Sequence, residues 1–290
     1  MNILSSKKTH PTSDGAGVKL TRVHGFDDHF LNPFLMVDQI ISDDMSEIKE
    51  GFPAHPHRGF ETLTYLKQGA FSHKDSMGNT GSIQSGGAQW MSAGSGVIHS
   101  EMPEDSDSPV RGFQLWLNLP AKDKMKTPEY QDVQSDEMPW IDFNGAKVKV
   151  IGGDIDINQQ TLKGPLQSLP ANISVVDIEL EPNTQLNIDS KNRKTMILVY
   201  KGHLQDSTKP KDSSKPQDSL RQVLLNVDPQ DLVLKSADQK VELLLLVGEP
   251  INEPVAHYGP FVMNTQDEID QAVNDYNNGT LVQEQPKINS

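Results

Sequence analysis

Two pairs of residues in this chain have the types and the spacing of metal ligands. His55 and His57 are separated by one residue, and so are His99 and Glu101. Residues two apart on a β-strand point to the same face of a sheet, so each pair can present both side chains to one side. Two such strands lying side by side would direct three imidazoles and one carboxylate to a single point. The spacing therefore predicts a metal site in a β-barrel.

The combination of the two pairs supports this interpretation, because a single His-X-His pair is more often structural or exposed than ligating. Glycine-rich turns border the pairs, at Gly51 and at Gly94–Gly96. Pro56 lies between the first two histidines, and an edge or bulged strand can hold a proline at such a position.

The ligand types limit the choice of metal. Three imidazoles and one carboxylate suit iron, manganese, cobalt, nickel, copper or zinc. A closed tetrahedral zinc site would use all four ligands, whereas a six-coordinate ion would keep two positions open for substrate or oxygen. The chain contains no cysteine, which excludes thiolate ligands, disulfides and cysteine nucleophiles. Iron(II) is the preferred ion, because mixed imidazole and carboxylate ligation with open positions is its usual setting in oxygenases.

Three polar residues near the pairs have expected roles of their own. Glu61 shares the strand parity of His55 and His57, so it could be a fifth ligand, a salt-bridged residue or an orienting group, of which orientation is preferred. Gln114 is a candidate lining residue, although its strand neighbours could equally turn outward. Arg58 is expected at the surface, either solvated or paired.

The elements that must position these residues are short strands. Apolar segments alternate with Gly, Pro, Asn and Asp along most of the chain, which is typical of a β-sandwich or barrel. The clearest expected strands are Thr62–Leu66, Phe113–Leu117, Lys147–Ile151, Ile173–Leu180, Met196–Tyr200, Gln222–Val227, Leu232–Leu234 and Val241–Val247.

One helix is expected near the C-terminal end. Thr265 and Glu268 have the spacing of a capping box. Four residues follow on one helical face and are expected to pack on a sheet: Ile269, Ala272, Val273 and Tyr276.

Length and composition narrow the classes of function. At 290 residues the chain can form one large domain or two ordinary ones. Its 26 basic and 40 acidic residues give a net charge of −14, which disfavours direct binding to a nucleic-acid backbone. The first residues lack the apolar core of a signal peptide, and the apolar stretch Leu243–Val247 is too short to cross a bilayer. The sequence therefore predicts a soluble cytoplasmic protein without a membrane partner.

Two polar segments are expected to lie outside the barrels. Ala121–Pro139 is charged, with prolines at its flanks, and is interpreted as an interdomain connection. Asp206–Ser219 contains no apolar residue that could be buried, so it is expected to form a flexible surface loop inside the second domain.

These residues and segments resemble the pirin family of the cupin superfamily. Phe52–Thr62 is similar to the pirin form of the first cupin motif, and Gln89–Pro103 is similar to the second. Three further segments are also family-like: Asn32–Asp38, Gln114–Asn118 and His257–Thr265. The similarity spans nearly the whole chain.

The resemblance implies an all-β bicupin with two antiparallel β-barrel domains of the jelly-roll or cupin type and a C-terminal helix. Residues 1–130 would form the N-terminal metal-binding cupin, and residues 140–290 a C-terminal cupin without a metal site. The sequence agrees with a C-terminal cupin that has no metal site, because no histidine lies between His99 and His203 and Asn187–Ser190 offers no imidazole.

The resemblance also implies the ligands and the activity. A single iron would be held by the residues that match the family motif: His55, His57, His99 and Glu101. The expected activity is that of a quercetin 2,3-dioxygenase, which opens the heterocycle of a flavonol with O2 and releases carbon monoxide. Glu101 would accept the proton of the flavonol 3-hydroxyl.

Two alternatives remain open at this point. The chain could be a non-enzymatic, iron-dependent regulator that binds transcription factors or metabolic enzymes. It could also be a barrel in which the metal only stabilises the fold.

Overall fold

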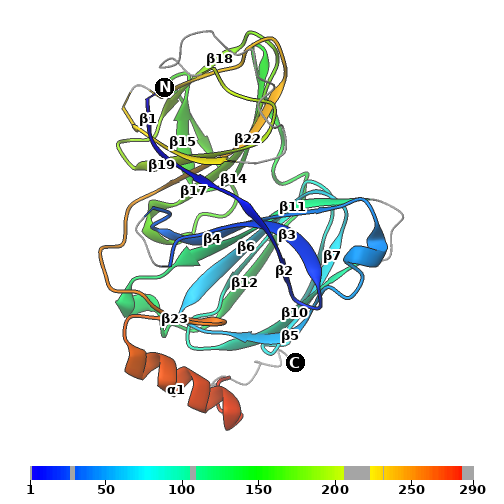
Figure 1. The fold of residues 1–290 in the computed structure, drawn as a ribbon, viewed down its shortest axis with the longest axis vertical. Helices are drawn as coiled ribbons and strands as arrows, with labels where there is room; N and C mark the ends of the chain where they lie inside the picture. Colours follow the sequence, from blue (N-terminus) through cyan, green and yellow to red (C-terminus); the bar gives the residue numbers. More distant parts are fainter. Residues whose placement is uncertain (1, 27–29, 105–108, 206–222, 231, 283–290) are drawn as a thin grey trace. The chain divides into compact units, whose positions relative to one another are not determined.

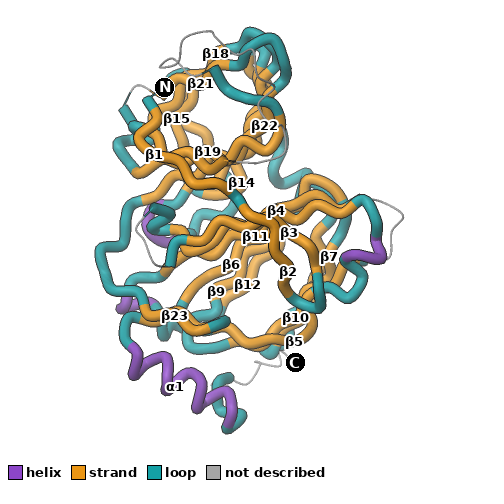
Figure 2. Tube along the Cα trace, viewed as in Figure 1, coloured by secondary structure: helices purple, strands orange, loops and turns teal. Residues whose placement is uncertain are grey.

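Two compact β-barrels make up the chain, and strands dominate each of them (Figures 1 and 2). The computed structural model describes residues 2–26, 30–104, 109–205, 223–230 and 232–282. One unit, called here the N-terminal barrel, contains Pro11–Ser135 and Ile251–Ser290. The other, the C-terminal barrel, contains Met1–His10 and Asp136–Pro250. The expected all-β bicupin with a C-terminal helix is confirmed.

The N-terminal barrel consists of a large and a small antiparallel sheet. The seven-stranded sheet has the order β12 (Glu129–Val133), β9 (Ala88–Ser92), β6 (Phe60–Gln68), β11 (Val110–Asn118), β4 (Phe34–Ser42), β3 (Val18–His24) and β2 (His10–Asp14). The four-stranded sheet has the order β5 (Phe52–His57), β10 (Val97–Pro103), β7 (Phe71–Asp75) and β8 (Thr80–Ile83). Two 3₁₀ helices, η1 (Met45–Glu47) and η2 (Ala121–Asp123), lie between strands.

The C-terminal barrel repeats this architecture. Its seven-stranded sheet has the order β1 (Ile3–Lys8), β20 (Val223–Val227), β19 (Lys194–Lys201), β22 (Val241–Gly248), β17 (Ser174–Leu180), β14 (Ala146–Gly152) and β13 (Ile141–Phe143). Its four-stranded sheet has the order β16 (Gln160–Lys163), β15 (Asp154–Ile157), β18 (Gln185–Asp189) and β21 (Leu232–Lys235). The 3₁₀ helix η3 (Pro170–Asn172) precedes β17. All eight predicted strands overlap observed ones.

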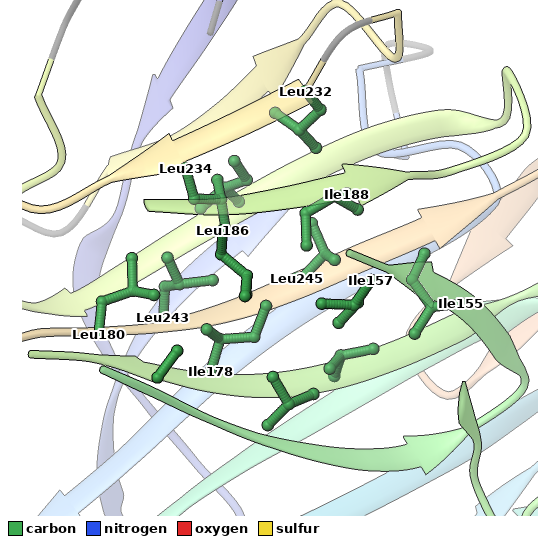
Figure 3. Close-up of a cluster of buried hydrophobic side chains, with 14 of the residues drawn as sticks. Ile155, Ile157, Ile178, Leu180, Leu186, Ile188, Leu232, Leu234, Leu243 and Leu245 are labelled. Carbon is green, nitrogen blue, oxygen red and sulfur yellow. The ribbon is translucent and has the colours of Figure 1, made fainter. Parts of the chain in front are cut away.

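Aliphatic side chains fill the interior of the C-terminal barrel. Five strands each contribute two residues spaced two apart, as the alternation of a strand requires. Figure 3 shows these residues pointing toward one another: Ile155, Ile157, Ile178, Leu180, Leu186, Ile188, Leu232, Leu234, Leu243 and Leu245. In β18, Asn187 and Asp189 occupy the alternate, exposed positions. That this barrel holds no metal remains a prediction.

Each end of the chain belongs to the barrel formed mainly by the other half of the sequence. The first strand, β1, pairs with β20 in the C-terminal barrel. The last elements, β23 (Ala256–Tyr258), β24 (Phe261–Met263) and α1 (Gln266–Asn277), belong to the N-terminal barrel (Figure 1). The compact units therefore differ at both ends from the expected domains 1–130 and 140–290.

The expected interdomain connection over Ala121–Pro139 is wrong for most of its length. It contains η2 and β12, and β12 pairs with β9 in the N-terminal barrel with Val133 fully buried. The boundary between the two units in this region falls between Ser135 and Asp136. The interpretation failed because β12 is an edge strand, where polar residues are common. The expected loop Asp206–Ser219 lies outside the described residues.

The C-terminal helix begins as predicted. Thr265 accepts a hydrogen bond from the Glu268 backbone through its hydroxyl, and its own backbone N–H donates to the Glu268 carboxylate at 2.9 Å. Ile269 and Ala272 pack against Phe261 and Met263 of β24, together with Leu281. Over the residues that the structure describes, no helix has the length and apolar character needed to span a bilayer.

Candidate metal centre

The two predicted pairs lie on neighbouring strands of the N-terminal barrel. β5 and β10 are antiparallel, and His55 is directly opposite His99 in their register. β5 is an edge strand of its sheet, which explains how it holds Pro56 opposite Ile98. The register shifts between His99 and Glu101.

Three imidazoles converge at this point. One ring nitrogen from each of His55, His57 and His99 lies within 4.8 Å of the others. The Nε2 atoms of His55 and His99 are 3.0 Å apart. Two ring nitrogens at that distance must share a proton or face a common cation, because two lone pairs alone would repel each other.

Backbone carbonyls orient two of these imidazoles. The Nδ1 atom of His55 lies 2.8 Å from the Pro53 carbonyl, and the Nδ1 atom of His57 lies 3.4 Å from the Pro260 carbonyl. A carbonyl can only accept, so each Nδ1 carries the proton and each Nε2 directs its lone pair toward the centre. This is the usual arrangement around a histidine that binds a metal.

Burial keeps the His57 and His99 imidazoles neutral. Desolvation lowers the pKa of His57 well below its usual 6.5, and the nearby His55 ring lowers it further. Desolvation likewise lowers the pKa of His99, with added repulsion from the His57, His55 and His73 rings. Neutral imidazoles are the forms that bind metals. The donor set, its orientation and its charge therefore fit a divalent metal ion.

Glu101 lies on the wall of the same cavity but outside the histidine cluster. Its Oε1 accepts a hydrogen bond from the Thr64 hydroxyl at 2.9 Å, and the residue is buried. Three of the four predicted ligands are thus brought together. The fourth faces a hydroxyl group of the opposite sheet.

A row of polar residues crosses the large sheet on the face that lines the cavity. Thr64 of β6 is paired with Gln114 of β11, Gln114 with Asp38 of β4, and Asp38 with Arg22 of β3. The Thr64 hydroxyl contacts Gln114 Oε1 as well as Glu101. One hydroxyl proton cannot serve both acceptors, but the two ends of the Gln114 side-chain amide can be exchanged. The Gln114 amide nitrogen then donates to the Thr64 hydroxyl, and the Thr64 hydroxyl donates to Glu101. Gln114 is therefore a lining residue, as predicted.

Arg22 and Asp38 are site residues that the sequence interpretation missed. Arg22 Nε donates to Asp38 Oδ1 at 2.8 Å, and one of its terminal nitrogens donates to Oδ2 at 2.6 Å. Both residues line the cavity, and Asp38 is 2% exposed. A carboxylate directly after the apolar run Phe34–Val37 was the available signal, because buried charges are rare unless they are paired.

The cavity, which His55 and His57 line, has a volume of about 750 Å³. The Phe26 and His257 rings stack at its edge with centroids 3.7 Å apart and planes 7° apart. Its remaining walls are mostly apolar and include Leu20, Met36, Ile40, Phe52 and Trp116. A cavity with a few polar groups and apolar, aromatic walls is the usual form of a small-molecule site.

The expected orienting role of Glu61 is wrong. Its carboxylate accepts hydrogen bonds from Trp90 Nε1 at 2.7 Å and from Lys126 Nζ at 2.8 Å, and it does not line the cavity. The parity argument failed because the chain changes sheets at Gly59, where φ is +86°. A Cβ at Gly59 would lie 2.1 Å from the Val262 carbonyl oxygen, so glycine is required for this change of direction.

Arg58 is buried, contrary to the expectation of a surface residue. Its guanidinium donates to the Ser95 carbonyl at 2.6 Å, to Asp275 of α1 at 2.7 Å and to the Leu281 carbonyl at 3.4 Å. Because Arg58 directly follows His57, these contacts attach the C-terminal segment to the strand that carries two of the imidazoles.

Removing the Asp275 carboxylate is expected to destabilise the fold. Asp275→Ala leaves the Arg58 guanidinium buried without its anion, which we expect to lower the free energy of unfolding by about 3 kcal/mol. Urea denaturation measures the difference. Asp270→Ala, on an exposed position of the same helix, is the matched control and should cost less than about 1 kcal/mol. Equal losses in the two variants would contradict the buried ion pair.

Lys124 makes a second attachment to the C-terminal segment. Its buried ammonium donates to the Gly59 carbonyl and Asn118 Oδ1 at 2.8 Å each, and to the Val262 carbonyl at 3.1 Å. Burial lowers the pKa of Lys124 from 10.5 to about 8.

The unfolding free energy is therefore expected to rise between pH 8 and pH 10.5. In this window the unfolded chain keeps a proton on Lys124 that the folded protein has released, so increasing pH favours the folded state. The difference in pKa corresponds to roughly 3 kcal/mol across the window. Urea denaturation as a function of pH should show this rise in the natural protein and in a Lys122→Met control, but not in Lys124→Met. The same rise in Lys124→Met would exclude Lys124 as its source.

Comparisons with known proteins agree with the site. A family model described as Pirin matches residues 17–117, and one described as the Pirin C-terminal cupin domain matches residues 175–282. A Vibrio cholerae protein provisionally named quercetin 2,3-dioxygenase is 44% identical over 271 residues, 93% of each chain. A Pseudomonas aeruginosa protein with the same provisional name is 38% identical, covering 97% of this chain and 98% of its own.

The fold has been solved for a similar protein. The crystal structure of a quercetin 2,3-dioxygenase from Acinetobacter baumannii has a TM-score of 0.81 and 30% identity, covering 97% of this chain and 98% of that chain. The two family models together cover most of the sequence, and the relatives match it along nearly its whole length. The chain therefore belongs to the pirin family.

Proposed function

We propose that this protein is a metal-dependent dioxygenase that cleaves flavonols such as quercetin with O2 and releases carbon monoxide. The observation that carries the proposal is the convergence of three imidazoles, two of them oriented by backbone carbonyls, beside a cavity with aromatic walls and a carboxylate. The names of the relatives from Vibrio cholerae and Acinetobacter baumannii support the choice of reaction.

The metal would be held by His55, His57 and His99. Glu101 is the predicted fourth ligand, and its oxygen that Thr64 does not hold would serve either the ion or the substrate hydroxyl. Iron(II) is our preferred ion, and manganese, nickel, cobalt, copper and zinc are the alternatives, because this donor set accepts all of them. When bound, the ion supplies Lewis acidity toward a flavonol hydroxyl and redox chemistry with O2.

Glu101 is the group that would accept the proton of the flavonol 3-hydroxyl. Thr64 holds one of its carboxylate oxygens, which leaves the other for the proton. A base positioned by a hydrogen bond needs no reorganisation when the proton moves, and such general-base assistance contributes typically about 10²–10⁴-fold to a rate.

The shape and polarity of the cavity would orient the substrate. The apolar walls suit the flat rings of a flavonol, and they exclude water from the reacting carbon atoms. Three neighbouring strands of the large sheet each contribute one hydrogen-bonding side chain to the cavity wall: Gln114, Asp38 and Arg22. The row of side chains spans two strand spacings, or about 10 Å. Substrate hydroxyl groups would lie along this row.

Reconstitution with iron(II) tests the proposed activity. The protein is loaded under anaerobic conditions and mixed with quercetin and O2, while flavonol absorbance and carbon monoxide are followed together. We expect carbon monoxide in proportion to the flavonol consumed, and none from metal-free protein. An iron-loaded sample that consumes no flavonol and releases no carbon monoxide would contradict the proposed substrate and would favour the regulator interpretation.

A further inference from the structure

The third imidazole of the cluster lacks the partner that the other two possess. His99 Nδ1 is buried and has no hydrogen-bond partner within the described structure. Buried polar atoms are normally hydrogen-bonded, so an orphaned one needs an explanation. His73 Nδ1 is the other ring nitrogen in this condition among the described residues. The two rings have centroids 5.3 Å apart and planes inclined by 53°.

His73 is held in place behind His99. It lies on β7 directly opposite Glu101, is 3% exposed and stacks on Tyr130 with centroids 4.4 Å apart. It is not among the residues that line the cavity. His73 is therefore placed to act on the site through its neighbours, of which His99 is the one with an unpartnered ring nitrogen.

Asp75 determines which nitrogen of His73 carries the proton. Asp75 Oδ2 lies 3.3 Å from His73 Nε2. The same carboxylate accepts hydrogen bonds from the Met77 and Asn79 backbone N–H groups at 2.9 and 3.0 Å, and from the Asn79 side chain at 2.8 Å. A carboxylate can only accept, so it favours a proton on His73 Nε2 and leaves a lone pair on Nδ1.

The proton positions on the two rings are complementary. When His99 Nε2 directs its lone pair at a metal, its Nδ1 must carry the proton in the neutral ring. The His99 ring then carries a donor at Nδ1 and the neighbouring His73 ring an acceptor, with the ring centroids 5.3 Å apart. Rings at this separation can form the hydrogen bond directly after a small rotation or through one water molecule.

We propose that His73 is a positioning residue of the metal centre, the middle member of a chain Asp75–His73–His99 that orients His99 toward the ion. It does for His99 what the Pro53 and Pro260 carbonyls do for His55 and His57. The inference rests on the proposed metal site and is independent of the reaction. Partners of this kind typically contribute about 10–100-fold to metal affinity.

Cobalt(II) binding to three variants tests the proposal. His73→Phe keeps the ring that stacks on Tyr130 but removes the acceptor, and we expect the dissociation constant to rise about 10–100-fold. Asp75→Asn offers an N–H to His73 Nε2, which moves the His73 proton to Nδ1. The Nδ1 atoms of His73 and His99 would then both be donors, so a comparable loss of cobalt(II) affinity is expected. Tyr130→Phe, which alters the other face of the His73 ring, is the matched control and should bind cobalt(II) like the natural protein.

A second test needs no variant. Nitrogen NMR of the zinc(II)-loaded natural protein with ¹⁵N-labelled histidine shows which nitrogen of each ring carries the proton. We expect His73 protonated at Nε2 and His99 protonated at Nδ1, with the His99 proton protected from solvent. A purely packing role predicts unchanged cobalt(II) affinity in His73→Phe. That result, or a His73 ring protonated at Nδ1, would overturn the proposal. Failure of the natural protein to bind either ion would instead overturn the metal site itself.

Discussion

Replacing His99 by alanine is expected to remove metal binding and flavonol cleavage together while the barrel remains folded. His99 Nε2 lies 3.0 Å from His55 Nε2, so its loss opens one side of the cluster and leaves two imidazoles on one edge strand. Loss of a partner that merely orients a ligand typically costs about 10–100-fold in affinity, so loss of the ligand itself should exceed that range. Metal content after reconstitution and carbon monoxide release measure the two effects.

His203→Ala is the matched control for this variant. His203 is an exposed histidine of the C-terminal barrel, and its contact is with the Gln239 side chain. The substitution removes the same type of side chain and should leave both metal content and turnover unchanged. Retention of stoichiometric iron and of carbon monoxide release by His99→Ala, with unchanged thermal unfolding, would exclude the three-histidine site.

The part of the site that could be predicted from sequence is the part imposed by strand geometry. Side chains alternate with a period of two, so spacing alone placed His55 with His57 and His99 with Glu101 on common faces. The pairing of β5 with β10 then brought His55 opposite His99. The eight expected strands and the capped helix followed from the same local rules of alternation, turn residues and capping.

The errors arose where the path of the chain leaves a single strand. Glu61 has the parity of His57, but the turn at Gly59 carries β6 into another sheet, and the carboxylate meets Trp90 and Lys126 instead. Strand alternation therefore applies only between two turns. Locating the turn from sequence required recognising that Gly59 must adopt a positive φ.

The orientation of the ligands depends on contacts that no local pattern contains. The carbonyl that orients His57 belongs to Pro260, which is 203 residues away in sequence. The guanidinium next to His57 is paired with Asp275 in α1. Such contacts result from the return of the C-terminal segment to the N-terminal barrel. The three-histidine cluster, whose members lie between residues 55 and 99, is therefore completed by a distant part of the same chain.

Replacing Glu101 by glutamine is expected to separate metal binding from catalysis. Glutamine keeps the size of the side chain and an oxygen that can accept from Thr64 or bind an ion, but it cannot take up a proton at neutral pH. If Glu101 is the base, turnover should fall about 10²–10⁴-fold while iron occupancy falls much less. The measurement is kcat for flavonol loss, normalised to the iron content of each sample.

The surroundings of Glu101 make this comparison interpretable. Its contact with Thr64 lies outside the histidine cluster, so the three imidazoles can keep an ion in the variant. Glu104→Gln, three residues further along the chain and bonded to Gln84 instead, is the matched control and should retain full turnover. Full turnover by iron-loaded Glu101→Gln would exclude proton acceptance by this residue. A parallel loss of iron and activity would instead show that its main role is as the fourth ligand, because activity per bound iron would then be unchanged.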